Sequence, residues 1–189
     1  MTSRRDFLQA TAVLSAAMPL SIRAGSPAGR PLALSSALID ERHAAAREFG
    51  ARVQRAGIAL RTIKGDVTDF WLDDLHPQWT RKPAPIAGLT ARPALFCLEQ
   101  LARDYRLRVV YHAEHKVQPD GSRSHTVHLP ARGLSAAELT AAGAAWPDYA
   151  ADAISRLTAA RSPCGPSSAC LEAAVGDDQI TLHSWVIAS

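Results

Sequence analysis

The chain has 189 residues, of which 47% are hydrophobic and 21% are charged, and its formal net charge at pH 7 is +3. These proportions are typical of a globular protein and exclude a chain that is disordered throughout. Most of the net charge lies in Arg4, Arg5 and Arg23 near the N-terminus, so the rest of the chain is nearly neutral and lacks the concentrated basic face that would make nucleic acid the partner.

The N-terminus combines paired arginines with a short apolar stretch. The pattern consists of Ser3, Arg4, Arg5, Phe7 and Leu8. The apolar stretch over 10–20 is shorter than the ~20 residues that a membrane-spanning helix needs. This segment resembles a bacterial twin-arginine (Tat) signal peptide, with Gln9 in place of the commoner lysine. The resemblance covers residues 1–28 and implies that the Tat translocase exports the chain, with cleavage after Ala24 or Ala28.

The resemblance implies that the mature chain lies in the periplasm. We expect no membrane anchor after cleavage, because no later segment is long and apolar enough to serve as one. We expect residues 29–189 to form a single α/β domain.

A strand, a helix and a second strand open this domain. Residues 32–39 form an apolar run, 42–56 carry apolar residues at helical spacing, and 58–63 again have strand character. The short connections predict a βαβ unit and therefore parallel strands. A helix is expected around 67–79, and a linker with two prolines follows it at 81–88.

The second half predicts a helix, a hairpin, further helices and a closing strand. Thr90 is expected to cap the first of these helices, with Pro93 in its first turn. Strands are expected at 106–115, 124–129 and 180–187, and Ser135 to Glu138 form a capping box that starts a helix. The predicted fold class is α/β, with a mixed sheet of about five strands and helices packed on it.

The predicted hairpin is rich in histidine. With its turn centred on Asp120, His112 lies opposite His128 and His115 lies opposite His125. Because side chains alternate between faces along a strand, Glu114 shares the face of His112 and His128. Two imidazoles and a carboxylate can hold a divalent metal such as Zn, Cu or Fe. The alternative is a solvated hairpin without a ligand.

A second candidate site follows from topology. Ligands of open α/β sheets bind beyond the carboxyl ends of parallel strands. Asp40 ends the first predicted strand, Asp66 follows the second, and Thr90 stands where a helix begins. These residues form a candidate ligand-binding rim, and the alternative is that they only cap helices.

The aromatic segment 69–79 is a candidate docking surface for a partner. We expect Phe70, Leu72 and Leu75 to face the core, which leaves Trp71 and Trp79 partly exposed.

The cysteines and serines offer little catalytic signal. Cys97 is expected to be a buried apolar residue, whereas Cys164 and Cys170 have the spacing of a local disulfide in an oxidising compartment. A serine hydrolase is not indicated, because Ser184 has no evident base at a meaningful spacing and no Gly-x-Ser-x-Gly motif is present.

These observations favour one function and leave two others open. Proteins with Tat signals are exported folded, either with a cofactor or with a partner, and this chain has no nucleotide-binding motif. We therefore expect a soluble periplasmic accessory subunit, without catalytic activity, of a larger redox enzyme. The alternatives are a metal-binding protein or metalloenzyme that uses His112, Glu114 and His128, and an enzyme or binding protein for a small ligand at the rim of Asp40 and Asp66.

Overall fold

The computed structural model describes residues 31–131, 134–158, 167–170 and 179–189. The predicted signal peptide lies outside these ranges, and so does Cys164 of the predicted disulfide. Among the described residues, no helix is long and apolar enough to span a membrane.

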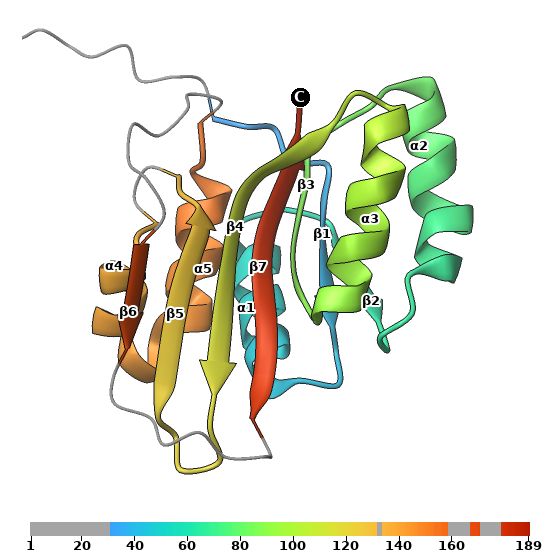
Figure 1. The fold of residues 1–189 in the computed structure, drawn as a ribbon. Coiled ribbons are helices and arrows are strands. Elements are labelled where there is room, and N and C mark those ends of the chain that lie inside the picture. The colour runs from blue at the N-terminus through green and yellow to red at the C-terminus, as the bar shows by residue number, and fades with distance from the viewer. Residues whose placement is uncertain (1–30, 132–133, 159–166, 171–178) are drawn as a thin grey trace, which may run out of the picture.

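The described residues form one seven-stranded sheet with helices on both faces (Figure 1). The strands are β1 (Ser36–Asp40), β2 (Leu60–Ile63), β3 (Ile86–Thr90), β4 (Arg108–Val117), β5 (Arg123–Leu129), β6 (Ser167–Cys170) and β7 (Ile180–Ala188). The helices are α1 (Ala44–Arg55), α2 (His76–Arg81), α3 (Arg92–Asp104), α4 (Ala136–Ala141) and α5 (Trp146–Ser155), with a π-helical turn at Phe70–Leu75 and a 3-10 turn at Gly143–Ala145.

The sheet is mixed, and its strand order is β2-β1-β3-β7-β4-β5-β6. β1 pairs in parallel with β2 and with β3, whereas β7 pairs antiparallel with β3 and β4, and β5 pairs antiparallel with β4 and β6. This arrangement confirms the predicted α/β class, the mixed sheet and the opening βαβ unit. The sheet has seven strands rather than about five.

The two additional strands are β3, which overlaps the expected linker, and β6, which lies where no strand was expected. β3 begins directly after Pro85, and all five of its residues are buried. Its sequence Ile-Ala-Gly-Leu-Thr is too short to show periodicity, and the prolines just before it are typical of a linker. β6 falls in the segment around the two cysteines, where Ser, Ala and Cys give little strand signal.

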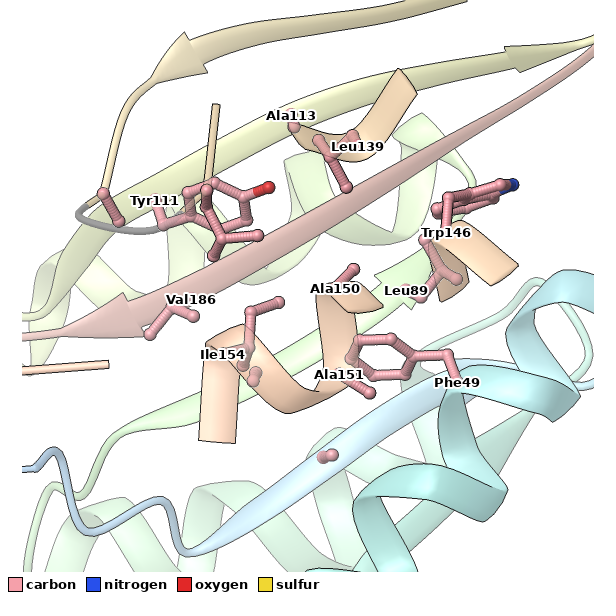
Figure 2. Packing of buried hydrophobic residues seen from close by; sticks show 14 of the residues in the cluster. Phe49, Leu89, Tyr111, Ala113, Leu139, Trp146, Ala150, Ala151, Ile154 and Val186 are labelled. Atoms are coloured by element: carbon pink, nitrogen blue, oxygen red, sulfur yellow. The ribbon is translucent and has the colours of Figure 1, made fainter. Parts of the chain in front are cut away.

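Two hydrophobic clusters lie on opposite faces of the sheet. One packs α1, α4 and α5 against the sheet, and Figure 2 shows Phe49, Tyr111, Trp146 and Ile154 within it. The other packs the π-helical turn, α2 and α3 against the opposite face. α3 packs against β7 and the beginning of β4 on that side, and in Figure 1 no described helix lies over β5 or over the rest of β4. We call this uncovered surface of β4, β5 and the start of β7 the open face.

The segment expected as a plain helix over 67–79 contains the π-helical turn. The N–H of His76 donates to the carbonyl of Trp71, five residues earlier, and this adds one residue to the turn. Phe70 and Leu75 are therefore both buried, and Trp79 follows Leu75 by four residues on the same side. Leu72, which was expected in the core, is 58% exposed.

Candidate ligand-binding site

The parallel part of the sheet contains a point where the chain reverses its direction across the strands. From β1 the chain passes through α1 to β2 on one side. From β2 it passes through the π-helical turn and α2 to β3 on the other side of β1, and these helices cover the face opposite to α1. The carboxyl ends of β1 and β3 therefore border the crevice where such sheets bind ligands.

Asp40, the last residue of β1, is fully buried at this crevice. Arg42 donates to it through Nε at 2.8 Å and through Nη2 at 2.6 Å, and His43 Nε2 lies 3.8 Å from Asp40 Oδ2. Burial alone would raise the pKa of Asp40, but the hydrogen bonds and charge of Arg42 outweigh it and hold that pKa below its ordinary value. Asp40 is thus a charged anchor for Arg42 and does not itself face a ligand.

The Arg42 side chain is half exposed and lies over Gly65. A Cβ at position 65 would stand 2.6 Å from Arg42 Cζ, and Gly65 has a φ of +95°, which favours glycine. No hydrogen bond of Arg42 Nη1 occurs within the described part of the chain. The buried Asp40 carboxylate and Gly65 therefore fix the position of the Arg42 guanidinium, while its Nη1 remains available to a ligand.

Thr90 does not cap α3 as expected. It ends β3, is fully buried, and its Oγ1 accepts a 3.0 Å hydrogen bond from Trp185 Nε1 on β7. The residue at the N-cap position of α3 is Ala91, and no side chain caps that end of the helix. The first turn of α3 thus keeps the backbone N–H groups of Arg92 and Ala94 without a side-chain acceptor, whereas Pro93 has no N–H.

Asp66 lies at the rim and holds a turn. Its Oδ1 accepts from the backbone N–H of Thr68 at 2.8 Å and from Thr68 Oγ1 at 2.7 Å, and these bonds lower its pKa. The structure therefore brings Asp40, Asp66 and Thr90 to one edge of the sheet, but each already has a hydrogen-bond partner there.

Two clefts open at this edge. The first has a volume of about 470 Å³ and is lined by Arg42, Lys64, Gly65, Asp66, Val67, Pro93, Ala94 and Cys97. It contains the Arg42 guanidinium, the exposed Lys64 and the uncapped first turn of α3. We call it the Arg42 cleft.

The second cleft shares Lys64 and Asp66 with the first and has a volume of about 410 Å³. Its charged lining is mostly acidic and consists of Glu41, Arg61, Lys64, Asp66, Asp69, Asp73 and Asp74. Arg61 binds Asp74 there at 3.0 Å, so part of this charge is paired. The basic and acidic clefts are therefore adjacent but distinct in charge.

Cys97 differs from its expected position. It is exposed and lines the Arg42 cleft, and Phe96 beside it is 52% exposed. The buried stripe of α3 consists of Ala94, Leu95, Leu98 and Ala102, which places Phe96 and Cys97 on the outer side of the helix.

The histidine hairpin forms, but its register differs from the expected one. His115 pairs with His125 as predicted, whereas His112 pairs with Leu129 because a β-bulge lies between His112 and Ala113. The rings of His112 and His128 stack nonetheless, with centroids 4.8 Å apart. No group of three or more His, Cys, Asp or Glu side chains in the described ranges is arranged to hold a metal ion, so the predicted set of His112, Glu114 and His128 does not converge as placed.

A further histidine, which was not among the predicted metal ligands, lies beside His112. His183 of β7 lies on the same open face, and its Nδ1 is 2.9 Å from His112 Nε2. Burial is the main cause that lowers the pKa of each of these two histidines to about 4. The signal that was missed is the alternation of β7, in which His183, Trp185 and Ile187 share one face.

A buried polar network occupies the other face of the sheet. Ser184 Oγ lies 2.7 Å from His115 Nε2 and 3.2 Å from the Tyr111 hydroxyl, and His115 Nδ1 lies 2.8 Å from His125 Nδ1. The expectation that Ser184 has no base nearby is therefore wrong, because β7 pairs with β4 across a long sequence separation. All four groups are buried, and His115 stacks on Trp146, so this network belongs to the core.

The predicted docking pair is only half present at the surface. Trp79 is fully buried, and its Nε1 donates to the Ala84 carbonyl at 3.1 Å. Trp71 is partly exposed and packs edge to face against Trp79 and Tyr105. The π-helical turn explains why Trp79 faces inward.

Comparison with models of protein families, with curated proteins and with solved structures finds no match to this chain.

Proposed function

We propose that this chain binds a small anionic molecule in the Arg42 cleft. One observation carries the proposal: an anchored guanidinium and the uncapped first turn of α3 line the same cleft, at the crevice beside the carboxyl ends of β1 and β3. Backbone N–H groups and the helix dipole favour a negative charge at such a helix end.

The charges of the cleft indicate a carboxylate or phosphate group as the part that is recognised. A guanidinium matches the two oxygens of such groups with parallel hydrogen bonds, and the Nη1 edge of Arg42 makes none within the described residues. Lys64, which is 79% exposed and 3.5 Å from Glu41, adds a second positive charge, and Asp66 is the acidic residue of the same lining. The volume of about 470 Å³ is in the range of small-molecule sites.

A thermal-shift titration tests this function. The full chain is titrated with inorganic phosphate, sulfate and a set of small carboxylates and phosphate esters. A ligand at about 100 times its Kd stabilises the folded state by about 2.7 kcal/mol, which raises Tm by roughly 5–10 °C for a domain of this size. Lys64→Ala is expected to reduce this shift without unfolding the chain, because Lys64 is largely exposed.

Lys82→Ala is the matched control. Lys82 is also an exposed lysine, but it follows α2 and does not line the Arg42 cleft. The proposal predicts an unchanged shift for Lys82→Ala. A screen in which no anion raises Tm, or in which both lysine variants respond like the wild type, would contradict it.

Export by the Tat route is a part of the proposal that rests on the resemblance of residues 1–28 alone. We expect the mature protein in the periplasm of its host. Changing Arg4 and Arg5 to lysine is expected to leave the chain in the cytoplasm, as measured by fractionation of the cells. Periplasmic recovery of that double variant would contradict a Tat signal.

The accessory-subunit hypothesis remains a second proposal, supported by the same resemblance. Trp79 is buried, so the pair of Trp71 and Trp79 cannot be the docking surface of such a subunit. Native mass spectrometry of the protein from its own periplasm separates the two proposals. A stable complex with a larger chain supports an accessory subunit, whereas a single chain carrying a small anion supports the binding protein.

A further inference from the structure

The open face gathers three imidazoles from three neighbouring strands. His183 lies on β7, His112 on β4 and His128 on β5. The His112 ring lies between the other two, with centroids 5.2 Å from His183 and 4.8 Å from His128. This group lies on a different part of the sheet from the Arg42 cleft and has no part in the proposed anion binding.

The separation of two ring nitrogens is informative. His112 Nε2 and His183 Nδ1 are 2.9 Å apart, and both atoms are on the facing edges of their rings. Imidazole nitrogens bind zinc at about 2.0–2.1 Å, so two nitrogens on one ion at angles between a right angle and a tetrahedral angle stand about 2.9–3.4 Å apart. The two nitrogens now share one hydrogen and point at each other. Rotation of both rings directs their lone pairs toward an ion that lies beside the line between them.

The charges around the pair restrict the kind of ion. Glu114 acts on both His112 and His183 by its negative charge, and Arg92 at the start of α3 acts on both by its positive charge. Lys116 binds Glu114 at 3.1 Å, so this carboxylate near the pair is itself paired. These cations disfavour an ion that is held mainly by charge, such as Mg²⁺ or Ca²⁺. Imidazole instead suits zinc, copper and nickel, which form directed bonds to nitrogen.

A third ligand is near but not in place. Among the described residues, no three His, Cys, Asp or Glu side chains converge on one point. His128 is exposed, and its ring stacks on His112 instead of turning a nitrogen toward the pair. An exposed ring can change its rotamer at little cost. His128 is therefore the nearby side chain that can become the third ligand.

We propose that His112 and His183 bind one transition-metal ion of the zinc, copper and nickel class, between Nε2 of the first and Nδ1 of the second, with His128 rotating to become the third ligand.

Titration of the full chain, free of any histidine tag, with ZnSO₄ in a calorimeter tests this site. The expected result is one ion per chain. His112→Gln and His183→Gln are each expected to weaken binding at least about 100-fold, and His128→Ala at least about tenfold, which corresponds to about 2.7 and 1.4 kcal/mol. His76→Ala is the control, because His76 is an exposed histidine at the start of α2 and is expected to leave the affinity unchanged.

A second readout separates loss of the site from loss of the fold. Electron paramagnetic resonance with Cu²⁺ is expected to show coupling to imidazole nitrogens in the wild type and not in His112→Gln, while circular dichroism shows that the variant is folded. Absence of Zn²⁺, Cu²⁺ and Ni²⁺ binding by the wild type overturns the proposal. Binding that persists unchanged in the His112→Gln, His183→Gln double variant also overturns it, since the ion then lies elsewhere.

Discussion

Gly65 lies beneath the guanidinium of Arg42, so that a Cβ built on Gly65 would be 2.5 Å from Nη2 of that arginine. The carboxylate of Asp40 accepts hydrogen bonds from Nε and Nη2 of the same group. Arg42 is therefore confined between a buried anion and a residue without a side chain, which explains how an exposed arginine can have a fixed position at the cleft.

Gly65→Ala is expected to weaken anion binding about tenfold or more, because its methyl group displaces the guanidinium. The positive φ at this position adds backbone strain of about 1 kcal/mol. Affinity is measured by calorimetry with whichever anion raises Tm, and stability is measured by urea unfolding.

Gly57→Ala is the matched control for that variant. Gly57 has a φ of +80°, but a Cβ there would meet no atom within 4 Å. It therefore carries the same kind of strain and is expected to lose stability without losing affinity. Equal affinities for the two glycine variants would show that Arg42 does not hold the ligand.

From the Asp40–Arg42 pair we expect a double variant of the two residues to have a higher Tm than Arg42→Ala alone. Arg42→Ala leaves the buried Asp40 carboxylate without its guanidinium, with only the backbone N–H of residue 42 at 3.3 Å and His43 at 3.8 Å beside it. This variant is expected to lower Tm by an amount on the order of 5 °C. Adding Asp40→Asn to Arg42→Ala removes the unpaired charge and is expected to restore part of that loss. A double variant with a lower Tm than Arg42→Ala would contradict this account of the pair.

Thr90→Val tests whether Thr90 holds Trp185 in place of capping α3. Valine has nearly the shape of threonine but leaves the buried Trp185 Nε1 without its acceptor, so we expect a loss of about 1–3 kcal/mol in the free energy of unfolding. Thr126→Val on the open face is the control and is expected to change stability by less than about 0.5 kcal/mol. Similar values for the two variants would contradict the assignment.

The histidines of the buried network predict loss of stability in acid. Burial lowers the pKa of His125 to about 4 and that of His115 well below its ordinary value. Between pH 6.5 and 4 the unfolded chain therefore binds more protons than the folded one, and stability falls as the pH falls through this window. Each such histidine contributes up to about 1.4 kcal/mol per pH unit.

Tm measured between pH 7.5 and 4.5 checks this prediction. The Tm of the wild type is expected to be constant above pH 6.5 and to fall below that pH. His125→Phe, which keeps a ring against Trp146 and cannot be protonated, is expected to decline less steeply. A wild-type Tm that stays constant down to pH 4.5 would contradict the burial of neutral imidazoles.

Much of this fold could be predicted from patterns of residues that lie close together in the sequence. The βαβ unit, the hairpin and the capping box of Ser135 and Glu138 depend on residues close together in the chain, and all of them form. β3 and the inward position of Trp79 were not predicted, because a buried five-residue strand and one π-helical turn leave no distinct periodicity.

The site was harder to predict for a physical reason. Topology placed Asp40, Asp66 and Thr90 at the correct edge of the sheet, but which of them is already hydrogen-bonded depends on contacts with distant residues. Thr90 meets Trp185 across β3 and β7, and the His112–His183 contact joins strands that are far apart in sequence. No local pattern contains these pairs.

Alkylation of Cys97 tests the central claim most directly, because this exposed thiol lines the Arg42 cleft. The anion that raises Tm is added at saturating concentration, and the rate of Cys97 modification by iodoacetamide is followed by mass spectrometry of its peptide. The account predicts that the anion slows modification of Cys97 in the wild type and in Lys82→Ala, and slows it less in Lys64→Ala. An anion that raises Tm and leaves the rate at Cys97 unchanged would place the ligand elsewhere and contradict the account.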